Sequence, residues 1–332
     1  MRGEKSSLEK RVWITWETQR RSIELAKKFD CELFVIEYKG ILRYPRSIIK
    51  TLSLLGSTKP HIVFVQNPSM ILATVACLYG FLKKIPLVVD RHTTFLLNKK
   101  HRNTPRLIIF KLLHRFTIRF ADLTIVTNDF LANLIRQLKG KPFVLPDMIP
   151  KLIQTGIAQL KGKHNILLIS SFGPDEPIKE VIEAMRHVED KENVYLYITG
   201  NYKKLDELTY KAAPSNVVFT GFLDEQEFIN ILFSVDAVIV LTTADYTMLC
   251  GCYEAVSARK PLITSNKDVL TEYFKGAIFV DNSAKDISNA ISEVIPNLDL
   301  HRERISSLKE RLVSEWEENF INLENQLVTL RH

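Results

Sequence analysis

The feature that most constrains the fold is a regular alternation of short β-branched runs with longer helical patterns along the chain. Such alternation is typical of α/β proteins built on parallel sheets. Runs such as ILLIS and AVIVL contain no alternating polar residues, which is expected of strands covered by helices on both faces. We therefore predict parallel sheets that are buried on both sides.

The runs form two series that are separated by one irregular segment. Residues 146–162 contain two prolines and two glycines, and we interpret them as a linker between domains. The length of 332 residues also favours two domains. The predicted strands are 12–16, 33–38, 62–66, 87–90, 123–127 and 143–145 in the first series, and 165–170, 194–199, 217–220, 237–241, 261–264 and 277–280 in the second.

The predicted organisation is two Rossmann-like domains, 1–150 and 151–300, followed by a closing helix at 301–332. Two such domains joined by a linker imply a deep cleft, with ligands at the carboxyl ends of the strands. The last segment has a single helical stripe of apolar residues, which favours return to the first domain over a coiled coil with another chain. The oligomeric state is left open. The stripe consists of Ile305, Leu308, Leu312, Trp316, Phe320, Leu323, Leu327 and Leu330.

Composition excludes several classes of protein. The net charge is +7 and 46% of the residues are hydrophobic, as in globular proteins. Four cysteines in so long a chain are too few for an extracellular disulfide framework. The charged start MRGEKSSLEKR is unlike a signal peptide, and the apolar stretch 70–82 is shorter than the about 20 residues that span a bilayer. We expect a cytoplasmic protein, either dissolved or lying peripherally on a membrane.

The most informative segment is 242–264, TTADYTMLCGCYEAVSARKPLIT. A strand ends before it, and a helix begins near Cys250 and Gly251 and carries Glu254 in its first turns. A helix amino terminus offers unpaired amides, here those of Gly251 and Cys252, to a phosphate or a sugar hydroxyl. A glycine allows a ligand to approach the backbone closely, and a carboxylate can accept two hydrogen bonds from a ribose diol.

The second half resembles the GT-B glycosyltransferases of the large retaining nucleotide-sugar family, the group 1 type. YEAVSARKPLIT is similar to the "E-A-x-A-x-G-x-P-V-I" segment of that family, in which the Glu binds the donor ribose. Glu254 matches this position. ISSFGPDEP, YITGN and NVVFTGFLDEQEF follow the family in order and spacing, and Asp224 with Glu227 forms a capping-box pattern.

The sequence departs from this family at two places that concern the donor. A family Glu eight residues before the ribose Glu is Tyr246 here, and whether Tyr246 or the adjacent Asp245 replaces it is left open. The Arg and Lys of a "G-R-x-x-x-x-K-G" turn, which hold the donor diphosphate, are also missing. We expect other groups to hold the donor, and the choice between retention and inversion is left open. The candidates are Lys179, Lys203 and the amides and hydroxyls of Ser171, Phe172 and Gly173.

The first half resembles the β-mannosyltransferases that extend lipid-linked chitobiose. Gln66, Asn67 and Pro68 match their "Q-N-P-P" strand end, and Asp90 and His92 match "V-I-D-W-H-N". The resemblance implies a lipid-linked acceptor and an acceptor-binding role for Asn67, and it does not fix the sugar. His92 is the candidate that hydrogen-bonds the transferred sugar or takes the acceptor proton, with Asp90 as the second candidate base. The alternatives are a capping or core histidine and a structural strand-end carboxylate.

Positive charge gathers where an acceptor phosphate would lie. Lys99, Lys100 and Arg102 follow His92 in a loop, and Arg20 and Arg21 follow the first strand. We predict that these five residues bind the acceptor, although an exposed helix face explains the two arginines equally well. No known nucleic-acid-binding module fits the pattern.

The helix after the basic loop has an apolar stripe and a basic stripe. It fits either the headgroup region of an anionic membrane or an ordinary core helix with a solvated basic face. The apolar stripe is Ile108, Leu112, Phe116 and Phe120, and the basic stripe is Lys111, Arg115 and Arg119.

Several chemistries lack their sequence patterns. There is no D-x-D pair, no H-x3-H or H-E-x-x-H spacing, and Cys250 with Cys252 has no companion C-x-x-C, so we expect no metal. Dinucleotide, P-loop and G-x-S-x-G motifs are absent as well, and we expect no cofactor besides the nucleotide-sugar co-substrate.

Together these features predict a metal-independent hexosyltransferase. The donor is a UDP- or GDP-sugar, and the acceptor is a membrane-associated, lipid-linked saccharide of glycan or cell-surface polysaccharide biosynthesis. Two alternatives remain: a degenerate GT-B protein that acts as a partner or scaffold, and a nucleotide-sugar epimerase.

Overall fold

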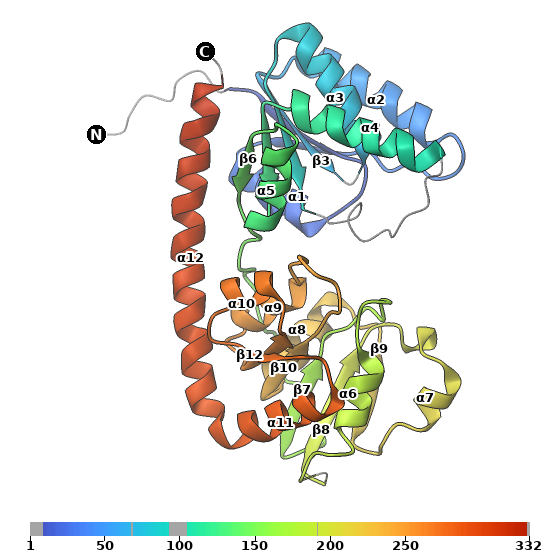
Figure 1. Ribbon diagram of the computed structural model, residues 1–332, viewed down its shortest axis with the longest axis vertical. Helices are drawn as coiled ribbons and strands as arrows, with labels where there is room; N and C mark the ends of the chain where they lie inside the picture. The colour runs from blue at the N-terminus through green and yellow to red at the C-terminus, as the bar shows by residue number, and fades with distance from the viewer. Residues whose placement is uncertain (1–8, 68, 93–104, 191, 331–332) are drawn as a thin grey trace. The chain divides into compact units, whose positions relative to one another are not determined.

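The computed structural model describes residues 9–67, 69–92, 105–190 and 192–330 (Figure 1). Contacts divide the chain into two compact units. The first unit is Met1–Met148 with Trp316–His332, and the second is Ile149–Glu315. Each unit is an α/β structure with its own sheet and its own core.

The first unit contains a six-stranded sheet in the order β2-β1-β3-β4-β5-β6, in which every neighbouring pair is parallel. The chain moves outward from β1 to β2 and then returns to the other side of β1, so the strand order reverses between β1 and β3. Such a reversal places a ligand crevice at the carboxyl ends of these strands. The strands are β1 Arg11–Thr15, β2 Glu32–Val35, β3 Ile62–Asn67, β4 Leu87–Arg91, β5 Leu123–Val126 and β6 Pro142–Val144.

Helices cover both faces of this first sheet, as the apolar strands predict (Figure 1). Successive strand residues point to opposite faces. Val12 and Ile14 join a cluster with α2 and α3, whereas Trp13 between them joins a cluster with α1 and α12. The helices are α1 Arg20–Lys28, α2 Arg43–Thr58, α3 Met70–Lys83, α4 Pro105–Phe120, α5 Asp129–Gln137 and α12 Leu298–Thr329.

The carboxyl-terminal helix α12 takes part in both units. It begins at Leu298, three residues before the predicted 301, and its residues up to Glu315 belong to the second unit. Beyond that point Trp316, Leu323 and Leu327 are buried in the Trp13 cluster of the first unit. The Trp316 indole Nε1 donates to the Pro146 carbonyl over 2.9 Å. The apolar stripe is therefore used within the chain.

The second unit contains a six-stranded parallel sheet in the order β12-β11-β10-β7-β8-β9. Here the strand order reverses between β7 and β10. The twelve predicted strands are all present, with shifted ends; the second of them ends at Val35 instead of residue 38. The strands of this unit are β7 His164–Leu168, β8 Val194–Thr199, β9 Val217–Gly221, β10 Ala237–Val240, β11 Leu262–Ser265 and β12 Ile278–Val280.

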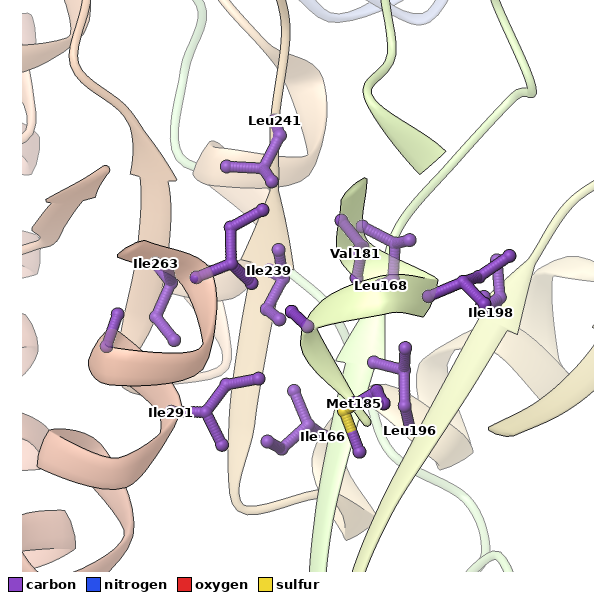
Figure 2. Packing of buried hydrophobic residues seen from close by; sticks show 14 of the residues in the cluster. Ile166, Leu168, Val181, Met185, Leu196, Ile198, Ile239, Leu241, Ile263 and Ile291 are labelled. Carbon is purple, nitrogen blue, oxygen red and sulfur yellow. The ribbon is translucent and has the colours of Figure 1, made fainter. Parts of the chain in front are cut away.

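The core of the second unit lies between one sheet face and the helices α6 and α11. Ile166, Leu168, Leu196 and Ile239 from three adjacent strands interdigitate with helix side chains such as Ile291 (Figure 2). The predicted capping box is confirmed, because Asp224 and Glu227 bond each other's backbone at the start of α8. The helices are α6 Ile178–Ala184, α7 Glu207–Lys211, α8 Glu225–Ser234, α9 Cys250–Ser257, α10 Asp268–Tyr273 and α11 Ala284–Val294.

No helix in the described part of the chain is both long enough and apolar enough to cross a membrane.

Candidate active site

In the second unit, the loops after β7 and β10 meet at the carboxyl edge where the strand order reverses. The Thr242 hydroxyl donates to Asp175 Oδ2 over 2.8 Å, and the Thr243 amide donates to the Asp175 carbonyl over 2.6 Å. Each loop holds a non-glycine residue in the left-handed region, Phe172 at φ 55° and Tyr246 at φ 62°. Such strain persists only where the surroundings fix the backbone, and it concentrates at functional sites.

The turn after β7 is organised around Glu176, which the sequence analysis did not select. Its carboxylate accepts hydrogen bonds from the amides of Ser171, at 3.0 Å, and Gly173, at 3.1 Å. It also accepts from the hydroxyls of Ser170, at 2.7 Å, and Ser171, at 2.9 Å. Successive amides that converge on one point form an anion-binding nest. In this structure the nest holds a carboxylate of the same chain.

This arrangement shows how three groups predicted to bind the donor are placed, and their donor-binding role stays a prediction. The amides of Ser171 and Gly173 are bonded to Glu176, and the Phe172 amide donates to the Ser170 hydroxyl over 2.9 Å. The three groups predicted to hold a donor phosphate therefore have partners within the turn. The sequence S-S-F-G-P-D-E contains Glu176, but only the geometry of the turn shows that its carboxylate accepts hydrogen bonds from the amides of Ser171 and Gly173.

At the start of α9, Gly251 serves helix packing. A Cβ built on Gly251 would lie 3.0 Å from Val240 Cγ1 and 3.2 Å from Ile169 Cγ2, so the glycine lets α9 lie directly on the sheet. The predicted role, close approach of a ligand, is thus corrected: Gly251 is buried and its Cα faces the strands.

Cys252 is also a packing residue. Its amide donates to the Leu249 carbonyl over 3.0 Å, and its thiol lies 3.5 Å from the Thr264 hydroxyl. Burial raises the pKa of this thiol to about 12, so it stays protonated. The predicted donor-binding amide of Cys252 is therefore engaged in the helix. Glu254, two residues further on, is half-buried on α9.

The cations predicted near this edge are arranged differently. Lys179 pairs with Asp206 over 2.7 Å, and this ion pair holds the pKa of Asp206 well below its usual range. Lys203 lies in the 3-10 helix Tyr202–Lys204, and it is its neighbour Lys204 whose Nζ reaches the Ser171 carbonyl, over 2.8 Å. Asp245, beside Tyr246, pairs with Lys267 over 2.8 Å.

In the first unit, the candidate residues Asp90 and His92 lie together at the end of β4. Asp90 is buried, and its Oδ2 lies 3.0 Å from His92 Nδ1. Burial disfavours the charged carboxylate, but the charge of Arg21 and the hydrogen bonds from His92 and Arg21 outweigh it and lower the pKa of Asp90 to about 2. Asp90 is therefore ionised at neutral pH and orients the partly exposed imidazole.

Arg21 does not face a ligand, which corrects its predicted acceptor role. Its guanidinium is buried and bonds both oxygens of Asp90, at 3.0 and 3.1 Å. The same group donates to Asp147 Oδ1 over 2.6 Å and to the Leu145 carbonyl over 2.9 Å. Arg21 thus ties α1, β4 and the end of β6 together behind His92.

The other residues predicted to bind the acceptor lie in different environments. Asn67 is buried, with its amide nitrogen 3.8 Å from Met70 Sδ, and its predicted acceptor-binding role stays a prediction. Arg20 is exposed and pairs with Glu24 over 3.0 Å. Lys99, Lys100 and Arg102 lie outside the described residues.

Arg91, between the two candidate catalytic residues, is also turned inward. Its guanidinium bonds His114 Nδ1 over 2.8 Å and the Thr117 hydroxyl over 3.0 Å. Burial and the nearby Arg91 lower the pKa of His114 to about 3, so this histidine is a neutral hydrogen-bond acceptor. Because successive residues of β4 point to opposite faces of the sheet, Asp90 and Arg91 belong to separate buried hydrogen-bond networks.

Two parallel six-stranded units, each with a reversal of strand order and a candidate site at its carboxyl edge, define a GT-B type of structure. The chain matches two family models, described as glycosyl transferases group 1 over residues 154–311 and glycosyltransferase family 4 over residues 15–151. This chain is therefore a glycosyltransferase of the GT-B type. No curated protein matches the sequence closely enough to serve as a relative.

Solved structures share this fold at low sequence identity. Sucrose-phosphate synthase of Thermosynechococcus elongatus is 12% identical with a TM-score of 0.78, and the match covers 97% of this chain and 99% of that one. HepE of Anabaena, solved with UDP and glucose, is 13% identical with a TM-score of 0.71, and the match covers 97% of this chain and 100% of that one.

Proposed function

We propose that this glycosyltransferase moves a hexose from a UDP-sugar to a lipid-linked saccharide at an anionic membrane surface. The observation that carries the proposal is the Asp90–His92 pair, which stands at the carboxyl edge of the first sheet on a motif similar to that of transferases with lipid-linked acceptors. UDP is the proposed nucleotide because HepE, which shares the fold, has been solved with UDP and with UDP-glucose.

The donor half of the proposal belongs to the second unit. Glu254 on α9 accepts hydrogen bonds from the ribose diol, and the diphosphate lies over the turn after β7. For a phosphate to use the amides of Ser171 and Gly173, the Glu176 carboxylate has to leave the nest that it fills. Lys204, bonded to the Ser171 carbonyl, is the cation adjacent to this turn.

The transfer itself is assigned to His92. An acceptor hydroxyl oxygen forms a bond to the anomeric carbon of the donor sugar, and the bond from that carbon to the diphosphate oxygen breaks, so UDP leaves. Because Asp90 holds Nδ1, His92 takes the proton of the hydroxyl through Nε2. The ionised Asp90 then stabilises the imidazolium that forms.

The membrane half of the proposal is supported by α4. Three residues of its predicted apolar stripe, Ile108, Leu112 and Phe120, are 47%, 62% and 52% exposed. The basic residues Lys111 and Arg115 of the same helix are exposed as well. A core helix would bury such a stripe, so exposure favours the membrane alternative over the ordinary one.

The neighbouring helices extend this surface. α3 contacts both α2 and α4, and these three helices lie on the same side of the sheet. Phe81 and Leu82 at the end of α3 are 75% and 76% exposed and are followed by Lys83 and Lys84. Exposed apolar side chains beside basic ones suit the headgroup region of an anionic membrane.

Independence from divalent metals remains part of the proposal. In place of a metal ion, the leaving diphosphate is stabilised by backbone donors, by the amino-terminal end of α9 and by Lys204.

The experiment is a transfer assay with radiolabelled UDP-sugars and extracted membrane lipids, scored as label that enters the lipid fraction. Wild-type protein should label lipid with at least one UDP-sugar, with and without EDTA. His92→Asn should lower kcat by about 100-fold or more, since a positioned general base contributes at least that much. The matched control is His164→Asn, a change at the opposite, amino-terminal end of a strand of the second unit.

Three results would contradict the proposal. Lipid labelling that survives His92→Asn removes the assigned base, and labelling abolished by EDTA removes the metal-free mechanism. A sugar that is isomerised in the absence of any acceptor would identify the protein as an epimerase.

A further inference from the structure

One cavity of the first unit is lined by residues to which no binding role has been assigned so far. Its volume is about 540 Å³, and its walls come from the segments after β1 and β2, the first turns of α2 and α3, and Phe110 of α4. These strands end where the strand order reverses between β1 and β3. This is the edge at which open α/β sheets bind ligands.

Aromatic rings form much of the cavity wall. Trp16, Tyr38, Tyr44 and Phe110 reach it from four different segments. The Trp16 indole is fixed by a 3.1 Å hydrogen bond from Nε1 to the Thr51 hydroxyl, and its ring centroid lies 6.4 Å from that of Tyr44. Rings that are already held in place lose little conformational entropy when they pack against a flat, weakly polar ligand face.

The polar groups of the cavity carry both signs of charge. Glu37 accepts a 2.6 Å hydrogen bond from the Thr18 amide, and Glu17 lines the same space. Lys39 supplies an ammonium, and the Arg43 guanidinium lies 4.4 Å from the centre of the Tyr44 ring. Carboxylates accept hydrogen bonds from hydroxyl groups, and the two cations donate hydrogen bonds to hydroxyl or carbonyl oxygens.

We propose that this cavity binds a pyranose ring of the acceptor saccharide. A pyranose has an apolar C–H face that packs on aromatic rings and a rim of hydroxyls that both donate and accept hydrogen bonds. The cavity offers those two kinds of contact together. The binding of a saccharide is inferred from the cavity alone. The statement that this saccharide is the acceptor rests on the proposed function.

Two other ligand classes fit less well. An acyl chain would remove water from the carboxylates of Glu17 and Glu37 without replacing their hydrogen bonds, which is unfavourable. A nucleoside diphosphate brings two phosphates to a cavity in which two carboxylates oppose the two cations.

The position of the cavity connects it to the candidate base. Trp16 follows Thr15, whose hydroxyl bonds the Gln66 side chain, and Gln66 pairs in the sheet with Asp90. The cavity and His92 therefore belong to the same carboxyl edge of one sheet. A saccharide seated on the aromatic wall is held by the unit that also carries the proposed base.

The test is saturation-transfer difference NMR with free chitobiose, N-acetylglucosamine, mannose and glucose as probes. Wild-type protein should transfer saturation to the ring protons of at least one of them. Tyr38→Ala, at a 41% exposed position, and Tyr44→Ala should each raise the Kd about tenfold. Tyr210→Ala, at a 42% exposed tyrosine of the second unit, should leave the Kd unchanged.

UDP binding, measured by calorimetry on the same samples, separates this inference from the proposed function. If UDP binds and no sugar does, or if both cavity variants bind sugar like wild type, the cavity assignment is overturned. Displacement of the sugar by UDP would identify the cavity as a nucleotide site and would overturn it as well. If sugar binds and UDP does not, the cavity assignment stands and the donor half of the proposed function fails.

Discussion

At the scale of single residues, the burial of charged side chains is the feature of this site that the sequence predicts least well. Arg20 and Arg21 are adjacent and chemically identical, yet one is exposed and the other is enclosed by two carboxylates and a carbonyl. The partners Asp90 and Asp147 stand 69 and 126 positions away in sequence. No local pattern could have revealed them, so the phosphate-binding role predicted for Arg21 came from its neighbourhood and not from its contacts.

Arg21→Met should lower the free energy of unfolding at pH 7 by about 3–5 kcal/mol, because it leaves the buried Asp90 without its cation. The folded-state pKa of Asp90 is depressed, so the stability it contributes is present above its unfolded pKa and is lost as the pH falls toward about 2. Urea unfolding of both proteins between pH 7 and pH 2.5 measures this. The difference between them should shrink below about pH 4; a constant difference would contradict the ion-pair account.

Glu176 and Lys204 show a second limit of prediction from sequence. The sequence places cations and small residues near the turn after β7, but it does not say that a carboxylate fills the nest or that Lys204, not Lys203, faces Ser171. These assignments depend on backbone torsions such as the left-handed Phe172. Knowing which residue types lie near a site therefore does not determine which side chains and backbone groups bond to one another.

At the scale of elements, Gly251 tests how α9 is seated. Gly251→Ala should destabilise the fold by about 1–3 kcal/mol, because its Cβ would meet Val240 and Ile169 at 3.0 and 3.2 Å. Gly56→Ala in α2 is the matched control, since a Cβ there would meet nothing within 4 Å. Helix propensity should make that second variant more stable by up to about 1 kcal/mol. Thermal unfolding compares the two, and equal effects would refute the packing role.

The exposed face of α4 makes a prediction about vesicle binding. Wild-type protein should sediment with anionic vesicles at low salt and be released as salt rises, since screening weakens the attraction. Leu112→Ser should weaken this binding about tenfold, because one large apolar side chain no longer enters the membrane. Phe222→Ser, at an 88% exposed residue of the second unit, is the matched control.

Two outcomes of the vesicle experiment count against a membrane role. If wild-type protein does not bind anionic vesicles at low salt, it has no membrane-binding surface. If Leu112→Ser and Phe222→Ser weaken vesicle binding equally, the membrane-binding surface is not the exposed face of α4.

At the scale of the whole molecule, the fold was largely predictable and the site was not. Strands that helices cover on both faces appear in the sequence as uninterrupted β-branched runs. Twelve such runs predicted the strands of both sheets. The spacing of Trp316, Leu323 and Leu327 likewise predicted that the last helix packs on the first unit. These signals are local. The roles of Asp90, Arg21 and Glu176 arise from contacts between distant segments, and sequence order does not encode those contacts in any short pattern.

The central claim is that the second unit holds the donor nucleotide at the edge between β7 and β10, with Glu254 on its ribose. Calorimetric titration of UDP into wild-type protein, Glu254→Ala and Glu189→Ala tests it, because Glu189 precedes β8 at the opposite edge of the same sheet. The account predicts binding by wild type and by Glu189→Ala, and an affinity about tenfold or more lower for Glu254→Ala. Equal affinities in all three proteins, or no UDP binding by wild type, would contradict it.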